Sequence, residues 1–156
     1  MRFKHGILWS ALLFAVLIFM TGCATPPQNL FTISGPEWHI QQGQGLWTPR
    51  AGAPQFGGDI VFATDDGKAF VQFAKTPLTI VTAQVSPDHW LIRFPQLNEF
   101  WYGRQPAPSR TIWLYLPDAL AGKPLPKPLH FENEPGGNWR LTNVKTGEIL
   151  EGFLSS

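Results

Sequence analysis

The chain has a single cysteine and no excess of positive or negative charge. Cys23 is the only cysteine, so no disulfide can form within the chain. Charged residues make up 15% of the sequence, the formal net charge is +1, and no run of basic residues occurs. Because proteins that bind nucleic acid carry a basic face, the sequence predicts no nucleic-acid partner.

Motifs of catalytic and metal sites are also missing. The sequence contains no Gly-x-Ser-x-Gly, His-Glu-x-x-His or Cys-x-x-Cys motif, and its histidines are widely separated. Glu148 and Glu151 could form a general acid/base pair, but they follow a turn on the terminal strand and are predicted to be solvated. We therefore expect a protein that is not an enzyme and that has no cofactor and no metal.

Only one long hydrophobic run is present, at residues 7–20, and Ser10 alone interrupts it. Arg2 and Lys4 precede the run, and small residues follow it. A charged start, a short apolar stretch and small residues at the end are typical of a secretory signal. A membrane-spanning helix needs roughly 20 apolar residues, so this run is too short for a permanent span.

The end of the signal resembles the lipobox of bacterial lipoproteins, with the sequence Met20-Thr21-Gly22-Cys23. The resemblance implies cleavage before Cys23 and attachment of three acyl chains, such as palmitate, to that cysteine. Ala24 follows instead of aspartate, which by the same resemblance favours the outer membrane, with the domain facing the periplasm. We expect a signal peptide at residues 1–22, a lipidated tether at 23–29 and one domain at 30–156.

Composition indicates that this domain is mainly β. The whole chain has 15 Pro, 15 Gly, 12 Phe and 7 Trp, which together favour short strands separated by turns. Asp65-Asp66-Gly67-Lys68 predicts a hairpin turn, because Asp-Gly readily adopts positive φ. Strands are expected at residues 60–64, 69–75, 78–85, 90–94, 100–103, 129–132, 139–144 and 148–154. Residues 30–57 suggest one or two further strands whose register the sequence does not fix.

The hydrophobic period changes once, after Ser109. Residues 110–116 have helical spacing, Ser109 can act as an N-cap, and Pro117 should break or restart the helix. Gly122 suits the C-terminal end. We expect an antiparallel, incomplete β-barrel whose concave face is covered by this helical crossing.

Aromatic residues exceed what the core of a domain of this size plainly needs. They can be interpreted in two ways, as a packed core or as the walls of a concave apolar cavity that binds acyl chains. The candidate cavity residues are Trp90, Phe94, Trp101, Trp113, Leu116 and Trp139.

The order of a β-run, a helical insert and a final β-run in a lipoprotein resembles the lipoprotein-localisation receptor and carrier superfamily (LolA/LolB type). The resemblance covers roughly residues 58–153. It implies a chaperone for protein transport that accepts acyl chains of other lipoproteins in an apolar cavity closed by helices. The anchored receptor presents a leucine to the membrane from a loop with an Asn-Pro-Leu-Gly-like sequence, and Lys75-Thr76-Pro77-Leu78-Thr79 lies in a comparable place. Leu78 is therefore the candidate membrane contact, although it could equally begin a core strand.

Two other classes remain open. A glycan- or peptidoglycan-binding lipoprotein would also use tryptophan platforms, with Asp, Asn and Arg beside them. A non-enzymatic envelope scaffold would use the aromatic residues to bind a protein. In each case we expect a monomer that contacts the membrane through its lipid anchor.

Overall fold

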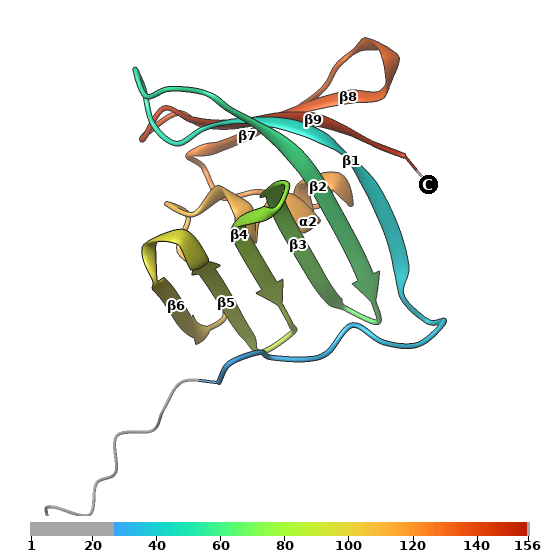
Figure 1. Cartoon of the computed structure of the whole chain (residues 1–156). Helices are drawn as coiled ribbons and strands as arrows, with labels where there is room; N and C mark the ends of the chain where they lie inside the picture. Colours follow the sequence, from blue (N-terminus) through green and yellow to red (C-terminus); the bar gives the residue numbers. More distant parts are fainter. Residues whose placement is uncertain (1–26, 156) are drawn as a thin grey trace, which may run out of the picture.

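An antiparallel sheet of nine strands makes up most of residues 27–155, the part of the chain that the computed structural model describes (Figure 1). The strands are β1 (His39–Thr48), β2 (Phe56–Asp65), β3 (Lys68–Lys75), β4 (Leu78–Val85), β5 (His89–Phe94), β6 (Glu99–Arg104), β7 (Leu129–Asn133), β8 (Asn138–Asn143) and β9 (Glu148–Ser155). Their order across the sheet is β6-β5-β4-β3-β2-β1-β9-β8-β7. The sheet curves, but its two edge strands, β6 and β7, do not pair with each other. The predicted incomplete barrel is therefore confirmed. The predicted signal peptide and Cys23 lie outside the described residues.

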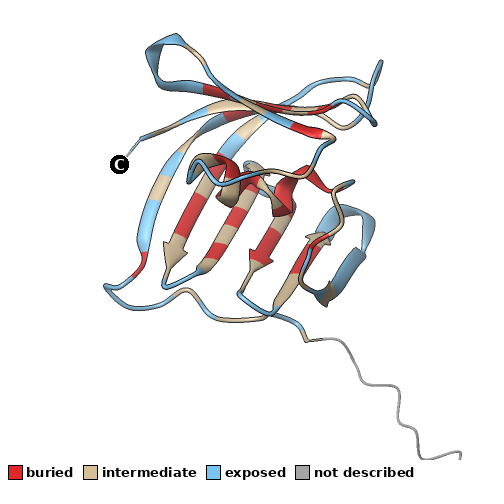
Figure 2. Cartoon of the chain, turned by 180° about the vertical axis from the view of Figure 1, so that it is seen from behind, coloured by how far each residue is buried: buried red, intermediate tan, exposed pale blue. Residues whose placement is uncertain are grey.

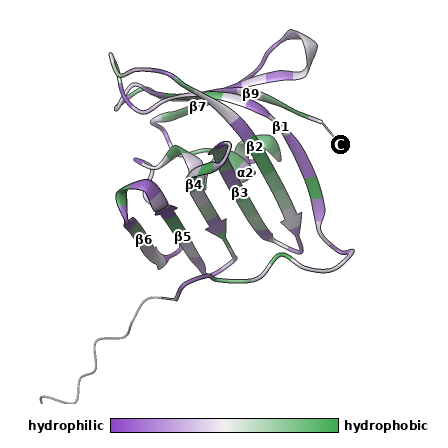
Figure 3. Ribbon diagram, in the orientation of Figure 1, coloured by the Kyte–Doolittle hydropathy of each residue, from purple (hydrophilic) through white to green (hydrophobic). Residues whose placement is uncertain are grey.

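Alternation of apolar and polar residues explains why these segments form half-buried strands. In β3, for example, Ala69, Val71 and Phe73 are buried, and their neighbours are less so. Figure 3 shows hydrophobic and hydrophilic positions side by side along β2 to β5. The turn between β2 and β3 has φ of 36° at Asp66 and 76° at Gly67, as a two-residue hairpin with two positive φ values requires.

Strand β1 is the element whose register could not be predicted. Its sequence is rich in Gln and Gly, so it shows little hydrophobic alternation. The structure explains the glycines: Gly45 pairs with Gly58 on one side and with Gly152 on the other. A Cβ at Gly45 would come 2.9 Å from the carbonyl oxygen of Glu151, so only glycine allows these strands to approach this closely.

The helical crossing between β6 and β7 is shorter and more irregular than expected. It consists of a 3-10 turn, η2 (Ile112–Leu114), and one turn of α-helix, α2 (Leu116–Leu120). The prediction that Ser109 caps a helix from residue 110 was wrong, because Thr111 precedes η2 and makes no side-chain cap. Instead the carbonyl of Ser109 accepts a hydrogen bond of 2.9 Å from Asn143 Nδ2. Pro117 restarts the helix in its first turn, as proline does without losing a helical hydrogen bond.

Residues 27–38 lie against the outer face of the sheet. Phe31 stacks on Trp38 with a centroid distance of 5.4 Å, and its carbonyl accepts a hydrogen bond of 3.0 Å from Gln84 Nε2. Trp38 is only 8% exposed, and Leu91, which pairs with Gln84 and therefore shares its face of the sheet, is 2% exposed. The sheet therefore has a small apolar layer outside it and a larger core on its concave side.

Candidate functional site

The concave face of the half-barrel is closed by the helical crossing. Trp113 of η2 is completely buried, with its ring centroid 5.5 Å from that of Trp47 and 5.3 Å from that of Phe73. Ile112, Leu114, Leu116 and Ala119 of the crossing join the same apolar cluster. Figure 2 shows the buried positions of the strands and of the crossing gathered on this face. Many strands thus contribute apolar side chains to the concave face, and the short helical crossing covers it.

The six cavity candidates lie on or near this face but differ in exposure. Trp113 and Leu116 have no exposed area, Trp139 is 3% exposed, and Trp90 and Phe94 are half-buried. Trp101 is 42% exposed and meets Phe94 edge to face at 5.2 Å. The candidates therefore form a gradient from the centre of the core to the open edge at β6.

Trp47 of β1 connects these candidates, and it was not among them. Its ring is 6.3 Å from Phe94 and stacks on it, so Trp113, Trp47, Phe94 and Trp101 form one continuous aromatic row. Trp47 stands in the Gly- and Pro-rich part of the sequence, where no register was available. Its apolar side chain two residues after Gly45 was the only signal that it faces the core.

Two indole N–H groups in this core have no hydrogen-bond partner. Trp113 Nε1 and Trp139 Nε1 are both buried and unpaired among the described residues. A buried donor without a partner costs about 1–3 kcal/mol relative to one that is satisfied. Both nitrogen atoms are shielded from solvent, so a ligand could reach them only if the surrounding side chains moved.

Glu148 at the start of β9 fastens the crossing to the sheet. The prediction that it is solvated was wrong: it is only 7% exposed. Its Oε1 accepts a hydrogen bond of 2.9 Å from Trp47 Nε1, and its carboxyl group also accepts one from the backbone N–H of Ile112. Burial raises the pKa of Glu148 to about 7, and these two hydrogen bonds partly oppose the rise.

Leu78 is the first residue of β4, directly after the turn that follows β3, and it is 52% exposed. A leucine in a strand core would be almost fully buried, as Val81 is at 1%. The structure therefore places the candidate membrane contact at the tip of a hairpin. Nothing in the apolar core depends on it.

We expect the substitution Leu78→Glu to change the free energy of unfolding by no more than about 0.5 kcal/mol, because an exposed side chain buries little area. Val81→Glu on the same strand is the matched control, and it should lose several kcal/mol by burying an unpaired charge. Urea unfolding of both variants measures this. A loss above about 1 kcal/mol for Leu78→Glu would show that the side chain packs in the core.

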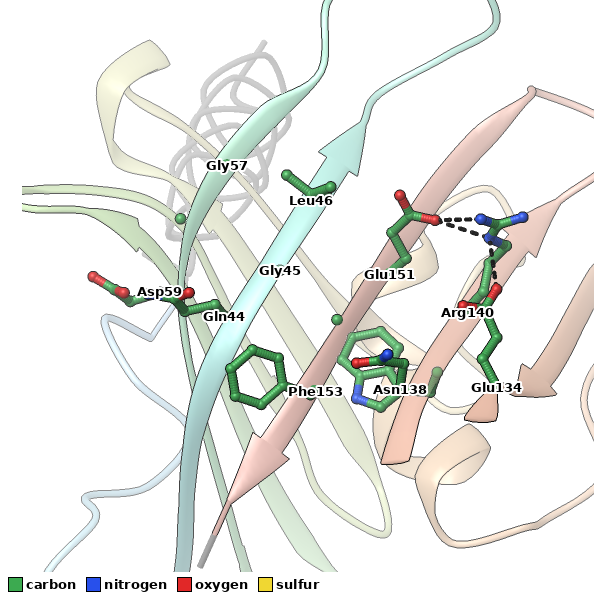
Figure 4. Close-up of a pocket in the computed structure, with 13 residues that line it drawn as sticks. Gln44, Gly45, Leu46, Gly57, Asp59, Glu134, Asn138, Arg140, Glu151 and Phe153 are labelled. Atoms are coloured by element: carbon green, nitrogen blue, oxygen red, sulfur yellow. Dashed lines mark hydrogen bonds and ion pairs between the residues drawn. The ribbon is translucent and has the colours of Figure 1, made fainter. Parts of the chain in front are cut away.

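A groove of about 590 Å³ lies on the outer face of the sheet, over β1, β2, β8 and β9 (Figure 4). Its walls include two cross-strand rows, Asp59-Gln44-Phe153-Asn138 and Gly57-Leu46-Glu151-Arg140. Arg140 Nη2 lies 2.8 Å from Glu151 Oε2, and Arg140 Nε lies 3.4 Å from Glu134 Oε1. The hydrogen bond and the two acidic neighbours raise the pKa of Arg140 above its ordinary value. The groove combines one aromatic ring with amide and charged groups, and Trp139 is the only cavity candidate in its lining.

No protein-family model matches the chain, and no curated protein matches it significantly. None of the helical segments within residues 27–155 has the length and hydrophobicity of a transmembrane helix. The same residues contain no group of three His, Cys, Asp or Glu side chains positioned to hold a metal ion.

Proposed function

We propose that this chain is a lipid-anchored protein of the outer membrane that binds acyl chains, or the acylated end of another lipoprotein, on the concave face of its half-barrel. The domain acts without catalysis, as a receptor for lipoproteins delivered through the periplasm. The export signal and the lipobox-like sequence ending at Cys23 support the anchoring. The arrangement of the sheet and of its helical cover supports the binding.

The observation that carries this proposal is the cover on the concave face. A large apolar surface is covered by η2 and α2, which together contribute eight residues, and by Ala107 and Leu125 in the segments that flank them. An acyl chain that enters between this cover and the strands gains about 0.8 kcal/mol for each CH₂ that it buries. The crossing therefore serves as a lid that moves outward, with Trp113 as part of the wall that the ligand then contacts.

The unpaired indole groups add a polar complement to this surface. An acyl chain of a lipoprotein ends in an ester or amide carbonyl, which is a hydrogen-bond acceptor. Trp113 Nε1 and Trp139 Nε1 are two buried donors of this core that have no partner among the described residues. A carbonyl bonded to either group would satisfy a donor that is otherwise left unpaired.

The open side of the sheet provides a way in. Because β6 and β7 do not pair, the barrel is open between them, and Trp101 is exposed beside Phe94 at one of these edges. The aromatic row then leads from Trp101 to Trp113. Leu78, exposed at the tip of the β3–β4 hairpin, is the proposed contact with the membrane during transfer, so Leu78→Glu should weaken transfer although the protein folds.

Native mass spectrometry of the full chain extracted from the envelope of producing cells tests this proposal. We expect a mature protein that begins at an acylated Cys23 and that retains an additional lipid or acylated peptide. An unmodified Cys23 would contradict the anchoring. A mature protein from which no lipid is ever recovered, even after incubation with fatty acid, would contradict the binding.

The outer-face groove favours a second candidate function, recognition of a glycan or peptidoglycan fragment. Phe153 offers an aromatic face, and Asn138, Gln44 and Arg140 offer polar groups around it. Sugar ligands use this combination of stacking and hydrogen bonding. The same mass measurement distinguishes the two functions, because a retained muropeptide or oligosaccharide in place of a lipid would support glycan recognition.

A further inference from the structure

Strand β6 exposes three consecutive aromatic side chains at an unpaired edge of the sheet. Phe100 is 42% exposed, Trp101 42% and Tyr102 41%, and Leu97 in the preceding turn, η1 (Pro95–Leu97), is 65% exposed. We refer to these four residues as the β6 edge. Soluble proteins usually protect an edge strand with charges, proline or a covering segment, because an exposed apolar edge invites association.

The side chains of this edge are held in place by the neighbouring strand. The guanidinium carbon of Arg93 lies 5.4 Å from the ring centroid of Phe100, and His89 stacks on Tyr102 at 5.5 Å. On the other face, Trp101 packs against Phe94. The edge is therefore an ordered surface of aromatic residues with two basic residues, Arg93 and Arg104, close by.

The N-terminal segment of the domain begins at the same place. Arg93 Nη2 donates a hydrogen bond of 3.1 Å to the carbonyl of Pro27, so Pro27 and Phe100 contact one guanidinium group. Cys23 is four residues before Pro27 in the sequence. Four residues span at most about 14 Å when fully extended, whereas a domain of this size is roughly 35 Å across.

From this geometry we propose that the β6 edge rests on the surface of the membrane that carries the lipid anchor. The proposal depends on the acylation of Cys23 that is part of the proposed function. A tether this short holds the bilayer close to the side of the domain where Arg93 binds Pro27. Trp and Tyr are the residues that proteins place at the membrane interface, and the exposed Arg104 suits lipid phosphate groups. The bilayer surface thus covers the apolar edge that no part of residues 27–155 covers.

The test uses the full chain, acylated in the producing cell, with one cysteine introduced at a time and labelled with an environment-sensitive dye. In the acylated protein the thiol of Cys23 carries lipid, so the introduced cysteine is the sole free thiol. Tyr102→Cys reports on the β6 edge. Asn133→Cys is the matched control, because it is exposed at the end of β7, next to the β7–β8 turn and far from β6 (Figure 1).

In vesicles of phosphatidylethanolamine and phosphatidylglycerol, we expect the dye at residue 102 to shift to shorter wavelength and to be quenched by lipids with nitroxide-labelled chains. The dye at residue 133 should show neither effect. An acylated protein that floats with the vesicles but gives no response at residue 102 would overturn the docking of this edge while leaving the anchoring intact. Equal responses at both residues would overturn it as well.

Two further outcomes would also overturn the membrane docking, and each has a distinct signature. A response at residue 102 that needs no vesicles and grows with protein concentration would show that a second copy of the chain covers the edge in place of the bilayer. A protein whose Cys23 is not acylated and which does not float would overturn the anchoring, and the docking with it.

Discussion

Replacing Trp113 with alanine is expected to lower the free energy of unfolding by about 3–5 kcal/mol, which is the usual cost of removing a large aromatic side chain from a core. Trp113 is the largest side chain of the crossing and is completely buried between Trp47 and Phe73. Its removal leaves a cavity under η2 that the short, proline-restarted crossing has little means to fill. Urea unfolding followed by circular dichroism measures the loss.

The same variant tests the proposed function. If the concave face binds acyl chains, Trp113→Ala removes both a wall and an N–H donor, and the affinity for a fluorescent fatty acid should fall by about tenfold or more, or at least 1.4 kcal/mol. The matched control is Trp38→Ala, at a residue that is 8% exposed and packed on Phe31 on the outer face of the sheet. It should also destabilise the fold but leave lipid affinity unchanged.

Equal effects of the two substitutions on lipid affinity would mean that affinity follows stability rather than the site. Unchanged affinity in Trp113→Ala, together with no lipid retained by the wild-type protein, would favour the groove or a scaffold function instead. The pair of variants therefore separates loss of folding from loss of binding.

The sheet could be predicted from the sequence because its signals are local. Alternating apolar residues and an Asp-Gly turn can be recognised within short segments. The expected order of six or seven strands, a helical crossing and three strands is confirmed, with six strands before the crossing. Strand β1 could not be placed because its glycines serve contacts with β2 and β9 that are distant in the sequence. The start of the crossing could not be predicted for the same reason. The carbonyl of Ser109 accepts a hydrogen bond from Asn143, which is distant in the sequence, and Ser109 does not cap a helix.

The candidate site was harder to predict than the fold. Helical spacing for Trp113 and Leu116, and the surplus of aromatic residues for Trp139, made these residues candidates for the concave face. Whether they fill a core or line a cavity depends on how closely the crossing packs. Trp47 and Glu148 were missed because their partners lie on other strands: the pair is separated by 101 positions in the sequence. The place of Glu148 beside a turn did not indicate that its carboxyl group would be buried and accept hydrogen bonds from Trp47 and Ile112.

Glu148 gives the domain a predictable dependence on pH. Its pKa is raised from the ordinary value of 4.5 to about 7, so between these values the folded protein binds more protons than the unfolded chain does. The free energy of unfolding must then decrease as pH rises. The contribution of the neutral carboxyl group is complete below pH 4.5, diminishes as pH rises, and is lost above about pH 7.

We expect this loss to be on the order of 3 kcal/mol between about pH 5 and pH 8, since each unit of pKa shift corresponds to about 1.4 kcal/mol. Urea unfolding across this range measures it. Glu148→Gln should remove this component of the slope, because glutamine keeps an oxygen acceptor for Trp47 and does not titrate. Glu151→Gln is the matched control, on the same strand but facing outward toward Arg140, and it should retain the slope. A wild-type slope that persists in Glu148→Gln would contradict the assignment to this carboxyl group. If the assignment holds, ionisation above about pH 7 leaves a charged carboxylate buried between η2 and β1, and the crossing should loosen before the sheet does.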